Sequence, residues 1–145
     1  EGTLTFMLGG DADDIAEIMS AFTAMGSEIN HLGPLGQGML CKVLNNMLAA
    51  SSVVAVREIL KAADALEFPR DRLLEVASSS SGATWFGDNL DKISWATEGY
   101  SLVNTIGILE KDVNALIDTT ADFPELRINE FARSVIAELR NLPEE

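Results

Sequence analysis

A lysine and two asparagines follow a glycine-rich turn, and these residue types can bind and protonate a polar ligand. Lys42, Asn45 and Asn46 are three and four positions apart, so on a helix they share one face. Burying an ammonium and two amides on an otherwise apolar helix is costly, whereas facing a cavity that holds a polar ligand avoids that cost. A solvated edge near the helix start explains the same spacing equally well, so both interpretations stand.

One long helix must carry these residues. Residues 38–66 contain no proline and no internal glycine, which predicts a helix of about 40 Å. Residues 43–56 are apolar on nearly every side, which predicts a helix buried at the centre of a bundle. Shorter helices are expected at residues 70–77, around Trp85, at residues 106–117, and from Pro124 onward.

The first 30 residues have a different pattern. Residues 3–8 are β-prone, and Asp11 is placed to cap a helix that ends near Met25. Residues 27–32 predict a second short strand, the one local partner for the first. Because so small a sheet leaves backbone groups unpaired, we expect these residues to be the last piece of a larger α/β domain.

The composition argues against several classes of function. The formal net charge is −13, from 23 acidic and 10 basic residues, so the surface repels phosphate backbones and anionic membranes. The sequence has one cysteine, Cys41, and one histidine, His31. It therefore cannot form an internal disulfide or a two-histidine metal motif. No signal peptide is expected, and the uncharged run 43–56 is too short to span a bilayer. We therefore expect no metal, nucleic-acid or membrane partner, and a reducing compartment, the cytoplasm or a mitochondrial matrix.

The segment 31–46 has the pattern HxGxxGxGxxxKxxNN, and it resembles the catalytic-helix signature of the β-hydroxyacid dehydrogenases. That family includes 3-hydroxyisobutyrate dehydrogenase and tartronate semialdehyde reductase. Residues 2–11 are similar to the last strand of the family's Rossmann domain, and residues 81–85 to its substrate-side loop. The Lys111-Asp112 pair resembles the family's second lysine motif, so the resemblance covers nearly the whole chain.

The resemblance implies a role for each polar residue of the motifs. Lys42 would be the catalytic lysine, and Asn46 and Asn45 would bind and support the substrate. Lys111 would contact the cofactor, NAD or NADP, and Asp112 would stay near it. The two asparagines after the lysine depart from the His-Asn of 6-phosphogluconate dehydrogenases, and the retained lysine argues against imine reductases. His31 is expected to pack or cap near the helix start rather than to catalyse.

The predicted fold is an all-α helical bundle around one long central helix, preceded by a short α/β remnant of a Rossmann-type domain. Residues 1–30 are assigned to that nucleotide-binding remnant and residues 31–145 to a helical C-terminal domain for substrate binding and dimerisation. The complete enzyme would interconvert a small β-hydroxyacid and its semialdehyde by hydride transfer. We expect the chain alone to be inactive, because the glycine-rich dinucleotide loop is missing, and to form a homo-oligomer. The alternative is a non-enzymatic helical binding or dimerisation module.

Overall fold

The computed structural model describes residues 4–144, and its internal contacts divide the chain into two compact units, Glu1–Asn45 and Asn46–Glu145. Each unit is described by itself. The long helix α2, Gln37–Ala65, passes from the first unit into the second. The boundary predicted from the sequence between residues 30 and 31 stays a prediction.

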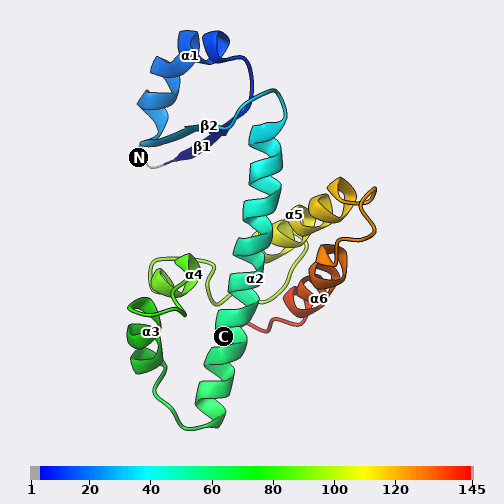
Figure 1. Cartoon of the computed structure of the whole chain (residues 1–145). Coiled ribbons are helices and arrows are strands. Elements are labelled where there is room, and N and C mark those ends of the chain that lie inside the picture. The colour runs from blue at the N-terminus through cyan, green and yellow to red at the C-terminus, as the bar shows by residue number, and fades with distance from the viewer. Residues whose placement is uncertain (1–3, 145) are drawn as a thin grey trace. The chain divides into compact units, whose positions relative to one another are not determined.

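The first unit opens with a strand–helix–strand motif (Figure 1). Strand β1, Thr5–Leu8, and strand β2, Glu28–His31, pair in parallel around helix α1, Ala12–Met25, with Phe6 opposite Ile29. The helix starts where predicted, because the carboxylate of Asp11 accepts a hydrogen bond of 2.9 Å from the backbone N–H of Asp13. The two predicted strands and their mutual pairing are thus confirmed within the described residues; residue 3, where the first strand was expected to begin, lies outside them.

Helix α2 is continuous, as its lack of proline and glycine predicts, but it is not buried on all sides. Its buried side chains form a single stripe: Val43, Met47, Ala50, Val53, Arg57, Leu60 and Ala63. The opposite side exposes large apolar side chains, and Leu48 is 72% exposed. The expectation of a helix buried all round is therefore wrong: the bundle covers one face. By length and composition alone α2 could cross a membrane, a test that the core helices of water-soluble proteins also pass.

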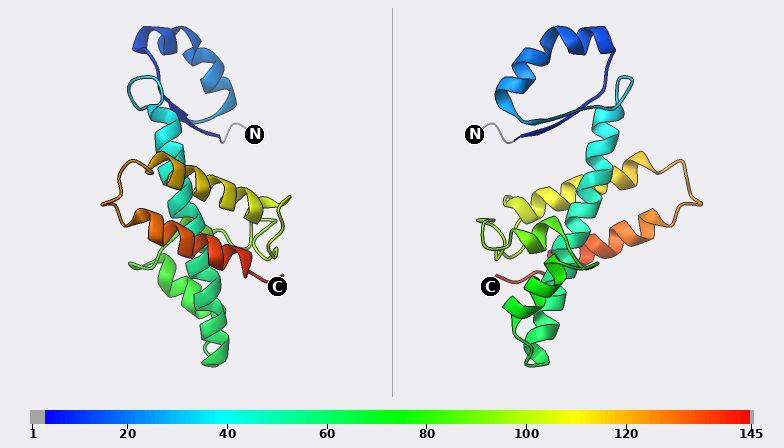
Figure 2. Two further views of the ribbon diagram at one scale, coloured as in Figure 1. Left: turned by 90° about the vertical axis from the view of Figure 1, so that its right-hand side faces the viewer. Right: turned by 60° about the vertical axis from the view of Figure 1, so that its left-hand side comes forward.

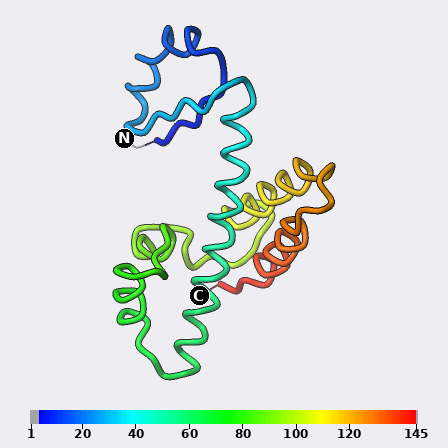
Figure 3. The backbone as a smooth tube through the Cα atoms, in the orientation of Figure 1, coloured from blue at the N-terminus to red at the C-terminus, as the bar shows by residue number. Residues whose placement is uncertain are grey.

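The second unit is helical. After α2 come α3, Arg70–Ser78, α4, Trp85–Asp88, α5, Thr105–Thr119, and α6, Ile128–Arg140. Helices α5 and α6 run side by side (Figure 2), while α3 and α4 form a separate short pair (Figure 3). The predicted all-α bundle around one long central helix is confirmed. Its core is made of fully buried aliphatic side chains, among them Ile106, Val113, Leu116, Ala132 and Leu139.

One helix boundary differs from the sequence prediction. The last helix begins at Ile128 rather than at Pro124, because residues 120–126 form turns closed by hydrogen bonds from Phe123 N–H to Thr120 O and from Leu126 N–H to Phe123 O. The fixed φ of a proline suits a turn as well as a first helical turn. The buried aromatic residue of α4 is Phe86, whereas Trp85 is exposed.

Two charged side chains are buried in the second unit. Arg57, 1% exposed in the buried stripe of α2, donates hydrogen bonds to the carbonyl oxygens of Glu98 at 2.6 Å and Pro143 at 2.5 Å. Glu110 of α5 accepts from Arg140 of α6 at 2.5 and 3.2 Å and from the hydroxyl of Tyr100 at 2.5 Å. The hydrogen bonds from Arg140 hold the pKa of the Glu110 carboxyl below its usual range. These bonds join segments that lie far apart in the sequence.

Candidate active site

The glycine-rich turn before α2 needs the conformational freedom of glycine at two positions. Gly33 has a φ of 108° and Gly36 a φ of 94°, values that side chains with a Cβ rarely adopt. The turn ends in the backbone bonds from Gln37 N–H to Pro34 O and from Leu40 N–H to Gly36 O, which start the helix. The spacing of these glycines therefore sets where α2 begins and, with it, where the motif lysine lies along the helix.

The start of α2 lies directly against the end of β1. A Cβ on Gly38 would lie 2.3 Å from the carbonyl oxygen of Met7, and a Cβ on Gly9 would lie 2.7 Å from the backbone nitrogen of Gly38. Backbone therefore packs on backbone with no room for a side chain. This contact fixes the first turn of α2 relative to the carboxyl end of the strand.

His31 holds the two loops together. Its Nε2 lies 2.9 Å from the carbonyl oxygen of Gly10 and 3.2 Å from that of Gly33, so the ring nitrogen acts as a donor to them. A backbone bond of 2.9 Å from Gly10 N–H to Gly33 O joins the same loops. These bonds agree with the predicted role of His31 near the helix start, and the expectation that it does not catalyse stays a prediction.

Lys42 and Asn45 lie in the part of α2 that belongs to the first unit, and both side chains are exposed. Within residues 4–144 Lys42 makes no ion pair. Helical spacing puts the two residues on adjoining turns of α2, with Asn46 one position further along. The ammonium of Lys42 is therefore open to a ligand in this chain.

Asn46 and Lys111 belong to the second unit, and Asp112 joins them there. Asn46 donates from Nδ2 to Oδ2 of Asp112 at 2.7 Å, which ties α2 to α5. The other carboxylate oxygen of Asp112 lies 3.4 Å from the ammonium of Lys111. Lys111 is 72% exposed and Asp112 is 14% exposed, so a shielded carboxylate stands beside an open cation. The resemblance placed Asp112 near the cofactor; its bond to Asn46, 66 positions away, is new.

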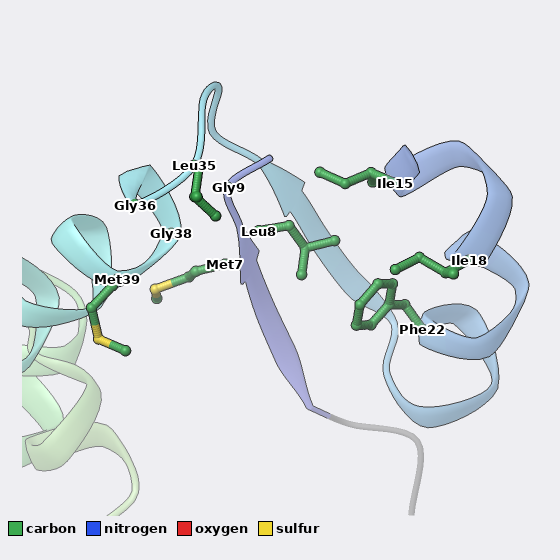
Figure 4. Close-up of a pocket in the computed structure, with 10 residues that line it drawn as sticks. All are labelled: Met7, Leu8, Gly9, Ile15, Ile18, Phe22, Leu35, Gly36, Gly38 and Met39. Carbon is green, nitrogen blue, oxygen red and sulfur yellow. The ribbon is translucent and has the colours of Figure 1, made fainter. Parts of the chain in front are cut away.

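Apolar hollows lie in both units. In the first unit a hollow of about 440 Å³ lies along β1, between the apolar side chains of α1 and the start of α2 (Figure 4). The side chains of Leu8, Ile18 and Phe22 converge on one side of the strand, and Met7 points toward Met39 on the other. A second hollow of about 240 Å³ lies among α2, α3 and α4. In residues 4–144 no group of three or more His, Cys, Asp or Glu is placed to hold a metal.

Comparisons with known proteins cover most of the chain. Residues 36–141 match the family model described as the NAD-binding domain of NADP-dependent 3-hydroxyisobutyrate dehydrogenase. The chain is 40% identical over 84 residues to an NAD-dependent L-serine dehydrogenase of Pseudomonas aeruginosa, which covers 58% of this chain and 28% of that protein. It is 31% identical over 103 residues to the human mitochondrial 3-hydroxyisobutyrate dehydrogenase, which covers 71% of this chain and 31% of that one.

A solved structure has the same fold. The Mycobacterium tuberculosis 3-hydroxyisobutyrate dehydrogenase, determined with L-serine, superimposes with a TM-score of 0.79 at 23% sequence identity. The superposition covers 99% of this chain and 52% of that one. The chain thus spans about a third of the length of the curated relatives above and about half of the solved structure.

Proposed function

Because this chain belongs to the 3-hydroxyisobutyrate dehydrogenase family, we propose that it is the C-terminal part of a dehydrogenase that uses NAD or NADP. The reaction is the interconversion of a small β-hydroxyacid and its semialdehyde. The observation that carries the proposal is the tight glycine turn that leads into α2 and is followed by an open lysine and two amides, the family's motif in its expected setting.

Lys42 is the acid/base residue in this proposal. NAD or NADP, when bound, would supply the hydride acceptor for the alcohol carbon, and the protein would have to remove the proton of the hydroxyl. A lysine placed at that oxygen takes the proton during oxidation and returns it during reduction. The exposed side chain of Lys42 has no counter-ion within the described part of the chain, so its nitrogen is available for this transfer.

The remaining polar residues bind rather than react. Asn45 and Asn46 supply neutral hydrogen-bonding groups for the substrate beside the lysine. Lys111 is an open cation on a chain whose net charge is −13, and such a group suits the phosphates or the carboxamide of a dinucleotide. Lys111 therefore fits one side of a cofactor site.

The other side of that site requires a preceding α/β domain. Strand β1 pairs with β2 along one edge, and an apolar hollow of about 440 Å³ flanks it. An unpaired strand edge beside uncovered apolar side chains is a common place for a sheet to continue. We therefore place a dinucleotide-binding domain before this chain, and we expect the isolated chain to be inactive.

Self-association is also part of the proposal. The exposed stripe of α2 includes Leu48 and Ile59 in the second unit, and contiguous apolar surface of this kind favours a protein partner. A second copy of the enzyme is that partner here. A non-enzymatic helical binding module is the alternative function that the same stripe favours. We propose the cytoplasm or a mitochondrial matrix as the compartment, because the chain has one cysteine and no disulfide.

Substitution of Lys42 in the complete enzyme tests the proposed function. Lys42→Ala should lower kcat by about 100-fold or more, the usual contribution of a general acid or base. Lys42→Arg should not restore activity, because a guanidinium does not release its proton near neutral pH. The exposed Lys61 of the same helix, whose partner is Glu58, supplies the matched control, and Lys61→Ala should leave kcat unchanged. A near-native kcat in either Lys42 variant would refute the assignment.

A further inference from the structure

Asp112 dictates which end of the Asn46 side chain faces away from it. An ionised carboxylate can only accept hydrogen bonds, so the group that approaches Asp112 at 2.7 Å must be the NH₂ end of the amide. The carbonyl oxygen of Asn46 then points elsewhere. Within residues 4–144 no donor bonds to this oxygen. The side chain of Asn46 is therefore oriented so that its carbonyl oxygen can accept a hydrogen bond from a ligand.

The contact is well placed to keep this orientation. Asp112 is 14% exposed, so water competes weakly for its oxygens, and charge-assisted hydrogen bonds are stronger than neutral ones. Turning the amide over would put two acceptor oxygens against each other.

We propose that Asp112 is a positioning residue that makes Asn46 an acceptor for the hydroxyl of the alcohol substrate. This inference rests on the proposed function, in which Asn46 faces the substrate. On binding, the alcohol donates its O–H to the Asn46 oxygen, and the hydroxyl then turns to the nitrogen of Lys42 when the proton is transferred. The carbonyl of the semialdehyde has no hydrogen to donate. Asp112 thereby makes the site discriminate between the two forms of the substrate, in favour of the alcohol.

Asp112→Asn in the complete enzyme removes the constraint without changing the size of the side chain. Besides accepting from Asn46, the new amide can donate to the Asn46 oxygen, which allows the Asn46 NH₂ to turn toward the substrate. The KM of the hydroxyacid should rise about 10-fold, the value of one hydrogen bond, while the KM of the semialdehyde stays the same or falls. General damage to the fold would raise both. Asp118→Asn, the same change at an exposed site on α5, should alter neither KM.

Side-chain amide exchange supplies a test that needs no catalysis. The NH₂ protons of Asn46 should exchange with water more slowly than those of the exposed neighbour Asn45, and Asp112→Asn should reduce that difference. Equal exchange at both asparagines in the unsubstituted protein would overturn the inference, and so would parallel changes in the two KM values. Because this readout is independent of turnover, failure of the inference is distinct from failure of the Lys42 assignment.

Discussion

Two regions of this protein are each stabilised by a different kind of internal interaction. The turn that starts α2 depends on the absence of side chains: a Cβ on Gly38 would lie 2.3 Å from Met7 O. The second unit depends on large polar side chains that cross between elements, such as Arg57 to the carbonyl of Pro143 and Arg140 to Glu110. The first arrangement is rigid but tolerates no added atom, whereas the second loses stability when atoms are removed.

This difference suits what each part has to do. The turn has to set the first residue of α2, and with it the place of Lys42, so a contact between backbones with little freedom serves it well. The helical unit has to hold Asp112 and Lys111 on α5, and bonds from Tyr100 and Arg140 to Glu110 fix that helix. Unfolding of the second unit can be followed by tryptophan fluorescence, because Trp85 and Trp95 both lie in that unit. The stability of the first unit then needs a different measurement.

Gly38→Ala should have the largest effect on stability, and it should act on the first unit. The added methyl group overlaps the carbonyl of Met7, and overpacking of this severity costs about 3 kcal/mol. Hydrogen exchange measures this loss of stability locally. The protection of the Gly10 and Leu32 amides, which donate to Gly33 O and Leu8 O, should fall about 100-fold.

The control for this change is Gly10→Ala in the same unit. A Cβ there meets Ile15 at 3.6 Å, an ordinary contact, so stability should change by less than about 1 kcal/mol. Equal loss of protection in both variants would show that the turn is sensitive to any side chain, and the close approach at Gly38 would then have no special role.

Arg57→Met should have the next largest effect and should act on the second unit. It keeps much of the side-chain volume but leaves the carbonyls of Glu98 and Pro143 without their donor. Loss of buried hydrogen bonds of this kind costs about 2 kcal/mol. Urea unfolding followed by tryptophan fluorescence should show the lower midpoint, whereas Lys61→Met, at an exposed ion pair four positions further on, should shift it little.

The sequence predicted those features that follow from local rules. The turn glycines, the Asp11 cap and the run without proline or glycine each act within a few residues, and the structure places the corresponding elements within a few residues of the predictions. The resemblance added the roles of Lys42 and Asn46, which no periodicity contains. Their chemistry stays a prediction until the complete enzyme is tested.

The features that escaped prediction depend on which elements pack together. Arg57 marked the end of an apolar run in the sequence, yet it is buried because the segments around Glu98 and Pro143 supply acceptors. Asp112 accepts a hydrogen bond from Asn46, which lies 66 positions away in the sequence. A charged residue in an apolar helix is a signal of such a contact, but its partner cannot be found without the tertiary structure.

The smallest expected effect concerns the carboxylate of Glu110 and depends on pH. Hydrogen bonds from Arg140, and then from Tyr100, lower the pKa of Glu110 in the folded state. A group whose folded pKa is depressed adds stability above its unfolded pKa, about 4.3 for glutamate, and this stability disappears as the pH falls through the folded pKa. Because the side chain of Arg140 is 58% exposed, solvent screening limits the contribution to about 1 kcal/mol at neutral pH.

Glu110→Gln isolates this contribution. The variant should be about 1 kcal/mol less stable than the unsubstituted protein at pH 7, and the two should converge as the pH falls through the lowered pKa of Glu110 in the folded state. Urea unfolding at several pH values, followed by tryptophan fluorescence, measures the difference. Glu75→Gln removes a carboxylate from an exposed pair with Arg72 and should show almost no pH-dependent difference. If the difference in the free energy of unfolding between Glu110→Gln and the unsubstituted protein stayed constant from pH 7 to pH 3, Glu110 would stabilise the fold by packing. The second unit would then depend less on charged side chains than the contrast with the glycine turn of the first unit requires.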